Sequence, residues 1–209
     1  MRTILCFGDS NTHGTMPMAT LDGNGRFDHA ARWPSVMGSA LGPGYEVIAE
    51  GHPGRTTVHD DPMEGPHRSG IRVLPSLLES HQPLGMVIVM LGTNDLKNCF
   101  HVSADDIAFF IDRLVRVIQG FDAGIKVLVV APPPIVEVGC LAGMFAGGAA
   151  KSAGLAAAVG AMTDRMGVAF FDAGAVIAVS PVDGIHYEAA DQVALGQALA
   201  DEVRGMWDA

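Results

Sequence analysis

Three side chains in this 209-residue sequence could together activate a hydroxyl for nucleophilic attack: Ser10, Asp183 and His186. A free serine hydroxyl is a weak nucleophile, and an imidazole near it can act as the base that it needs. In Asp183-Gly184-Ile185-His186 the carboxylate comes three residues before the ring, so it can bond to one ring nitrogen and fix the tautomer. Taken alone, Ser10 is equally consistent with a helix cap, and the Asp-Gly turn with an ordinary turn before a helix. The chemistry therefore depends on a fold that brings these positions together.

Short apolar runs alternate with longer helical patterns along the chain. Most of the runs are apolar on both faces, as parallel strands covered by helices on both sides must be. Strands are predicted over residues 3–7, 45–49, 86–91, 126–131 and 168–171. Helices are predicted over residues 33–41, 69–80, 104–120, 147–166 and 188–207. The pattern predicts one α/β domain over residues 1–209, a three-layer α/β/α sandwich with a five-stranded parallel sheet.

Polar or turn-forming residues follow the first four predicted strands. In parallel sheets the ligand crevice lies beyond the carboxyl ends of the strands, so these residues should share one rim. They are Gly8-Asp9-Ser10-Asn11, Gly51-His52, Gly92-Thr93-Asn94-Asp95 and Pro132-Pro133-Pro134. Three irregular stretches, residues 13–32, 51–68 and 132–148, are too long for simple connections and are expected to wall the crevice.

Four motifs, in this order along the chain, resemble those of the SGNH (GDSL) hydrolases. They are Gly8-Asp9-Ser10-Asn11-Thr12-His13-Gly14, Gly51, Gly92-Thr93-Asn94-Asp95 and Asp183-Gly184-Ile185-His186. The likeness is strongest to the compact bacterial arylesterase, acetylesterase and perhydrolase/acyltransferase group. Residues 5–10, 50–51, 54–57, 88–95 and 171–174 carry this closer likeness. The resemblance runs from the first strand to the last helix and implies the flavodoxin-like SGNH hydrolase fold.

The resemblance also implies a role for each matched residue. Ser10 is expected to be the nucleophile, His186 the general base and then acid, and Asp183 the group that orients the imidazole. The expected oxyanion donors are the backbone N–H groups of Ser10 and Gly51 and the side-chain amide of Asn94. These residue types suit the roles, because only glycine lets the backbone approach closely at position 51, and an amide donates strongly without adding charge.

Four further positions are predicted to contact the substrate: Asn11, His13, Arg55 and Ile135. Asn11 follows the nucleophile where similar sequences often carry leucine, and His13 stands where an aromatic residue is common. Both departures change the expected shape and polarity of the acyl pocket and leave the triad untouched. For Arg55 a structural role, in which it pairs with a carboxylate, is the favoured alternative.

The function predicted from these residues is hydrolysis of small carboxylic esters, with short acyl groups of acetyl or aryl-ester type, through an acyl-Ser10 intermediate. An alternative is transfer of the acyl group to an alcohol or a peroxide, because acceptor choice depends on how dry and narrow the crevice is. A more distant alternative is a non-catalytic small-molecule binding module on the same kind of sheet. A binder, however, needs no serine, glycine, asparagine and Asp-x-x-His at four crevice positions.

Composition limits the partners and the compartment. A formal net charge of −10 and a pI near 5.1 argue against nucleic acid as a partner, because neutralising phosphates needs clustered Lys and Arg. No apolar stretch reaches membrane-spanning length and no signal-peptide pattern follows the N-terminus, so a cytoplasmic protein without a membrane partner is expected.

No cofactor and no metal are expected either. His52, His59, Asp60, Asp61 and His67 include possible ligands, but neither two histidines at helical spacing nor a Cys pair accompanies them. The segment 135–145 is expected to expose more apolar side chains than a lone surface loop should, which predicts a homo-oligomer that covers it and restricts the pocket.

Overall fold

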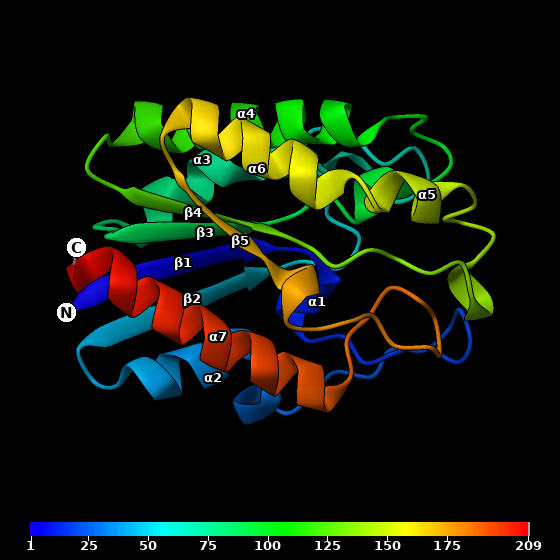
Figure 1. Ribbon diagram of the computed structural model, residues 1–209, viewed down its shortest axis with the longest axis horizontal. Helices are drawn as coiled ribbons and strands as arrows, with labels where there is room; N and C mark the ends of the chain where they lie inside the picture. The colour runs from blue at the N-terminus through cyan, green and yellow to red at the C-terminus, as the bar shows by residue number, and fades with distance from the viewer. Residues whose placement is uncertain (209) are drawn as a thin grey trace.

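A five-stranded parallel sheet lies at the centre of the computed structural model, which describes residues 1–208 (Figure 1). Its strand order is β2-β1-β3-β4-β5, and neighbouring strands pair in parallel. The strands are β1 (Arg2–Gly8), β2 (Tyr45–Gly51), β3 (Met86–Met90), β4 (Lys126–Ala131) and β5 (Ala169–Asp172). All five predicted strands are present, with bounds that differ by at most two residues.

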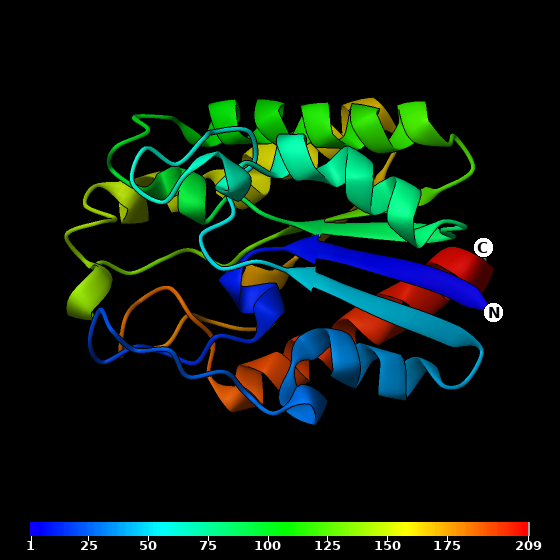
Figure 2. The ribbon, with the colours of Figure 1, turned by 180° about the vertical axis from the view of Figure 1, so that it is seen from behind.

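Helices cover both faces of the sheet, so the predicted three-layer sandwich is confirmed (Figures 1 and 2). On one face lie α2 (Trp33–Leu41) and α7 (Ala189–Asp208). On the other lie α3 (Gly70–His81), α4 (Ala104–Phe121), α5 (Gly148–Ser152) and α6 (Leu155–Met166). Of the helices in residues 1–208, none combines the length and the apolar character that a membrane span requires.

Alternation along the strands divides the core between the two faces. In β1, Leu5 and Phe7 pack with α3 and α4, whereas Ile4 and Cys6 pack with α2 and α7. Each of these side chains is at most 1% exposed, which explains why the strand reads as a continuous apolar run. The prediction that Cys6 belongs to the core is confirmed.

The predicted helix over residues 147–166 is wrong in one respect, because the structure divides it into α5 and α6. At the break, the N–H of Gly154 bonds to the carbonyl of Lys151, three residues back, in place of the carbonyl four residues back. Glycine has a low helix propensity and does not resist such an interruption.

The order of the strands places the functional end of the sheet. From β1 the chain connects to β2 on one side of β1 and then crosses to β3 on the other side. The connections therefore reverse direction between β1 and β3. Such switch points open a crevice at the carboxyl ends of the strands. The long irregular segments gather at that end of the molecule, opposite the two termini (Figures 1 and 2).

Candidate active site

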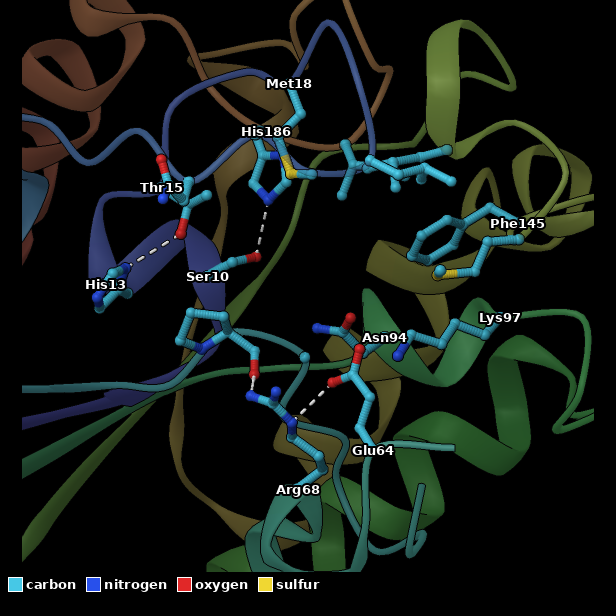
Figure 3. A pocket seen from close by; sticks show the side chains of 18 of the residues that line it. Ser10, His13, Thr15, Met18, Glu64, Arg68, Asn94, Lys97, Phe145 and His186 are labelled. Atoms are coloured by element: carbon cyan, nitrogen blue, oxygen red, sulfur yellow. Dashed lines mark hydrogen bonds and ion pairs between the residues drawn. The ribbon is translucent and has the colours of Figure 1, made fainter. Parts of the chain in front are cut away.

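The structure brings Ser10, His186 and Asp183 into one hydrogen-bonded chain. Ser10 begins the short helix α1 (Ser10–His13), directly after β1, and is 6% exposed. Its Oγ lies 3.1 Å from Nε2 of His186 (Figure 3). Nδ1 of the same ring lies 2.6 Å from Oδ2 of Asp183, which is fully buried. The imidazole is therefore placed to take a proton from the hydroxyl while the carboxylate fixes its orientation.

Asp183 is held by three backbone N–H groups as well as by the imidazole. Its Oδ1 accepts from Ile185 and His186, each at 3.0 Å, and its Oδ2 accepts from Met18 at 2.7 Å. Burial alone would raise the pKa of Asp183, but the hydrogen bonds from His186 and Met18 outweigh it and lower that pKa to about 2. The group is thus a carboxylate near neutral pH.

Gly184 shapes the turn that carries the acid and the base. Its φ is +73°, and a Cβ there would lie 1.7 Å from the carbonyl oxygen of Val136. Only glycine fits both conditions, because it tolerates positive φ and has no side chain. The backbone of Val136 also donates to the carbonyl of Gly184, at 3.0 Å, so the turn is fixed to the segment after β4.

The expected oxyanion donors come from the ends of three adjacent strands. Gly51 ends β2, pairs with Gly8 of β1, and lies against α1. A Cβ at position 51 would lie 2.1 Å from the backbone nitrogen of His13, so glycine is required for this approach. Asn94 begins the short 3-10 helix η3 (Asn94–Leu96) after β3, and it lines the same cavity as Ser10 and His186.

A cavity of about 390 Å³ opens in front of Ser10 and His186. Each of the three segments predicted to wall the crevice contributes lining residues. These include Met18, Leu21 and Asn24 from residues 13–32, Pro53, Glu64 and Arg68 from residues 51–68, and Leu141, Met144 and Phe145 from residues 132–148. That prediction is confirmed.

The two sides of the cavity differ in chemistry (Figure 3). One side is apolar and contains Met18 and Phe145. The other carries Lys97 and the ion pair between Arg68 and Glu64, whose Nε and Oε2 atoms lie 2.7 Å apart. A substrate in this cavity meets hydrocarbon on one side and charged groups on the other.

Lys97 is a cavity residue that the sequence analysis missed. Its side chain is 7% exposed, and Nζ lies 2.7 Å from Oδ2 of Asp61, which is 4% exposed. Oδ1 of Asp61 accepts the N–H groups of Met63 and Glu64, so the carboxylate that holds the ammonium is itself fixed. The sequence signal that could have indicated Lys97 is its position, three residues after Asn94 in the turn that follows β3.

Of the four residues predicted to contact substrate, only His13 lines the cavity. Its Nδ1 lies 3.1 Å from Oγ1 of Thr15. Burial, together with the positive charges of Arg26 and Arg32, lowers the pKa of His13 to about 4. The ring is therefore neutral near pH 7 and offers the cavity a polar group without a charge.

The other three, Asn11, Arg55 and Ile135, do not line this cavity. Asn11 donates to the carbonyl of Ile185 at 3.2 Å and is 1% exposed. Ile135 is 3% exposed and packs in the core on the α4 side of the sheet. Both side chains were assigned from their place in the sequence, which does not reveal the direction in which a side chain points.

Arg55 is 4% exposed, and its hydrogen bonds go to backbone carbonyls and not to a carboxylate, which its alternative interpretation expected. Nη1 donates to the carbonyl of Gly8 at 2.8 Å and also to that of Glu50, and the guanidinium lies 4.4 Å from the centre of the Phe7 ring. It therefore ties the end of β1 to the end of β2, the two strands that lead to Ser10 and end at Gly51.

In the loop that contains His52, His59 and His67, the guanidinium of Arg68 occupies the place beside the His52 ring. Nδ1 of His52 lies 3.1 Å from Nη1 of Arg68, and the ring of His52 meets that of His67 edge to face. A guanidinium at that nitrogen opposes a metal ion there, because a metal ligand must offer a free lone pair. Within residues 1–208, no three His, Cys, Asp or Glu side chains are grouped as metal ligands.

A buried serine, a histidine and a buried aspartate, joined in this order at the carboxyl edge of a parallel sheet, are the arrangement of a serine hydrolase. Residues 6–195 match the GDSL-like lipase/acylhydrolase family. The chain therefore belongs to that family, and it is a carboxylic ester hydrolase. The resemblance seen in the sequence is confirmed.

Two solved structures show how closely the whole chain follows this fold. An aryl esterase from M. smegmatis, in an inhibitor-bound form, is 42% identical with a TM-score of 0.94, and the match covers 98% of this chain and 99% of that one. A carbohydrate acetylesterase from Sinorhizobium meliloti is 41% identical with a TM-score of 0.94, and the match covers 99% and 100%. The comparison with curated proteins gave no significant match.

Proposed function

We propose that the protein hydrolyses small, short-acyl carboxylic esters through an acyl-Ser10 intermediate. The contact of 3.1 Å between Ser10 Oγ and His186 Nε2, inside a cavity that can hold an ester, is the observation that carries this proposal. The names of the similar structures, an aryl esterase and a carbohydrate acetylesterase, support small esters as the substrate class.

The reaction proceeds in two halves. As Oγ of Ser10 bonds to the ester carbonyl carbon, Nε2 of His186 takes the hydroxyl proton. His186 then gives this proton to the alkoxide oxygen of the alcohol as the C–O bond breaks, which leaves acyl-Ser10. Water attacks that ester with His186 again as the base, and the acid is released with Ser10 restored. Asp183 stabilises the imidazolium at each stage.

Negative charge develops on the carbonyl oxygen in both halves. The backbone N–H groups of Ser10 and Gly51 and the amide of Asn94 are the donors that we assign to it, because they come from the ends of β1, β2 and β3 at one rim. Donors fixed by strand ends need no reorganisation when the charge appears, and this is the source of their catalytic effect.

The direct test is turnover of p-nitrophenyl acetate with trapping of the intermediate. An acid quench during turnover, followed by mass spectrometry, should find an acetyl group on the peptide that contains Ser10. A fluorophosphonate should label the same peptide. Turnover without an acyl group or a label on Ser10 would reject the proposed intermediate.

Asn94→Ala should lower kcat by roughly 10²-fold, the usual loss for one side-chain oxyanion donor. KM should change little, because the ground-state carbonyl carries little charge. Steady-state kinetics with p-nitrophenyl acetate measure both constants. A rise in KM at constant kcat would instead make Asn94 a group that binds the substrate before reaction.

We also propose a homo-oligomer that narrows the cavity mouth. The expectation that the segment 135–145 exposes apolar side chains is met only in part, because Ile135, Leu141 and Phe145 are buried within the chain whereas Val136 is 49% exposed. Apolar exposure persists, however, at two cavity residues, Leu21 at 67% and Met144 at 39%.

Light scattering should therefore give a mass that is a multiple of 21.8 kDa. A panel of p-nitrophenyl esters should show that acetate and butyrate are preferred to octanoate. A monomer that prefers octanoate would mean that these segments form an open, lipase-like entrance.

The cytoplasmic location stays part of the proposal and is tested by cell fractionation.

A further inference from the structure

Asp9 is a buried carboxylate for which the proposed mechanism gives no role. It stands between the end of β1 and Ser10 and is 2% exposed. Its Oδ1 accepts the backbone N–H of Asn11 at 2.9 Å and so caps α1. Its Oδ2 accepts from Nδ2 of Asn94, at 3.3 Å, across the gap between the ends of β1 and β3.

Capping alone does not explain an aspartate here. Serine and asparagine cap helices about as well as aspartate does, and neither buries a negative charge. An ionised carboxyl that is removed from water costs free energy unless its environment compensates it. The second oxygen of Asp9, and the bond that it accepts from Asn94, must therefore supply what a neutral cap lacks.

The amide of Asn94 has two orientations that exchange its oxygen and its nitrogen. Both oxygens of an ionised carboxylate only accept hydrogen bonds, so Asp9 permits only the orientation with Nδ2 toward it. Nδ2 carries a second N–H, and Asn94 is a cavity-lining residue. In the opposite orientation the amide oxygen would take that place and would repel the negative charge that develops on the substrate.

We propose that Asp9 is a positioning residue whose ionised carboxylate holds the Asn94 amide with an N–H directed at the substrate oxyanion. The proposal rests on the proposed function, because Asp9 acts only through the oxyanion role of Asn94.

Charged and titratable groups from three other segments face Asp9. They are Arg55 after β2, Asp95 in η3, and His186 and Tyr187 before α7. Burial raises the pKa of Asp9 to about 6, although the Asn11 N–H, His186 and Arg55 each act to lower it. Burial likewise raises the pKa of Asp95 to about 7, and this second carboxylate accepts from the N–H and hydroxyl of Thr57, not from Asn94.

The sign of the pH dependence follows from the raised pKa of Asp9. As pH falls through about 6, Asp9 takes up a proton, its oxygen can donate, and the Asn94 amide is no longer fixed. The rate should fall with it. Stability should change in the opposite direction, because the folded state binds this proton more tightly than the unfolded state. The free energy of unfolding contributed by Asp9 therefore decreases as pH rises from about 4 to about 6.

Asp9→Asn tests the proposal with almost no change in volume. Its amide oxygen can still cap α1, but its NH2 group then opposes that of Asn94 and turns the amide around. We expect kcat to fall by roughly 10²-fold with KM within about twofold of wild type. Because a buried charge has been removed, Tm at about pH 8 should equal or exceed that of wild type. A fall in Tm together with kcat, in Asp9→Asn and also in Asp9→Ser, would indicate a merely structural role and overturn the proposal.

A double-mutant cycle with Asn94→Ala tests the route of action. If Asp9 acts through Asn94, the double variant should lose roughly 10²-fold in kcat, the same as either single variant, and not roughly 10⁴-fold. Multiplying losses would overturn the proposal, as would an unchanged kcat in Asp9→Asn. If Asn94→Ala alone leaves kcat unchanged, the oxyanion assignment of the proposed function fails first, and the inference about Asp9 fails with it.

Two further variants complete the experiment. Asp9→Ser keeps a capping oxygen but does not reach Asn94, so it should show the same loss in kcat if Asp9→Asn folds poorly. Asp95→Asn is the matched control, because Asp95 is equally buried and adjacent in space but does not contact the Asn94 amide. Whatever its own effect on kcat, that effect should multiply with the effect of Asn94→Ala. If the losses in kcat fail to multiply in the Asp95 cycle as well as in the Asp9 cycle, the coupling comes from the burial of a charge near Asn94. That result would overturn the specific role of Asp9.

Discussion

Ser10→Ala should lower kcat for p-nitrophenyl acetate by at least roughly 10⁴-fold, since removal of a triad nucleophile typically costs this much or more. The substitution removes one oxygen from a side chain that is 6% exposed and whose Oγ bonds to His186. Nothing larger enters or leaves the core, so Tm should stay close to the wild-type value. Initial rates and a thermal melt measure the two quantities.

Fluorophosphonate labelling gives this prediction an internal control. Label should disappear in Ser10→Ala and persist in Ser76→Ala, because Ser76 is exposed on α3 and bonds only to the carbonyl of Val73 in its own helix. If Ser10→Ala retains more than about a hundredth of the wild-type kcat, Ser10 is not the nucleophile. Label that persists in Ser10→Ala would point to a nucleophile other than Ser10.

The sequence predicted the parts of the site that follow directly from a strand. Ser10, Gly51 and Asn94 each come at or just after the end of one of three adjacent strands, so parallel pairing alone brings them to one rim. His186 and Asp183 were harder to place, because they follow β5 by more than ten residues. For them the prediction depended on the family motif more than on geometry.

The parts that sequence did not predict depend on directions of side chains and on long-range contacts. Arg55 was considered for the rim, but its guanidinium turns inward to the carbonyls of Gly8 and Glu50. Lys97 was not considered, although its buried ion pair with Asp61 places it on the cavity wall. A lone lysine in a loop is ordinarily solvated, and only the fold shows that an aspartate 36 positions away in sequence holds it inside.

The contact between Met18 and Asp183 is another that the sequence does not encode locally. It joins a cavity-wall segment to the triad across 165 positions, by a backbone N–H that any residue except proline supplies. The cavity-wall segment thus supplies one of the N–H groups that hold the carboxylate of Asp183. A side-chain substitution at position 18 therefore leaves this bond in place.

Asp183→Asn should lower kcat by roughly 10³- to 10⁴-fold with little change in KM, because an amide favours the wrong tautomer of the imidazole. In wild type, Oδ2 of Asp183 accepts from His186 and Met18, whereas Oδ1 accepts from two backbone N–H groups. Whichever way an asparagine turns, its NH2 group opposes two of these donors. If it faces His186, the ring must protonate Nε2, and this nitrogen can then no longer accept the proton of Ser10.

The substitution should also weaken the fold in a pH-dependent way. Because hydrogen bonds hold the pKa of Asp183 at about 2, below its value in the unfolded chain, its ionised form contributes stability that is fully present above about pH 4 and lost as pH falls toward 2. Tm of Asp183→Asn should therefore fall below wild type at neutral pH, with a smaller difference in acid. Met18→Ala is the matched control, since it keeps the backbone N–H that Asp183 accepts. It should retain kcat for p-nitrophenyl acetate within about tenfold of wild type, so an equal loss in both variants would place the effect in the cavity wall and not in the triad.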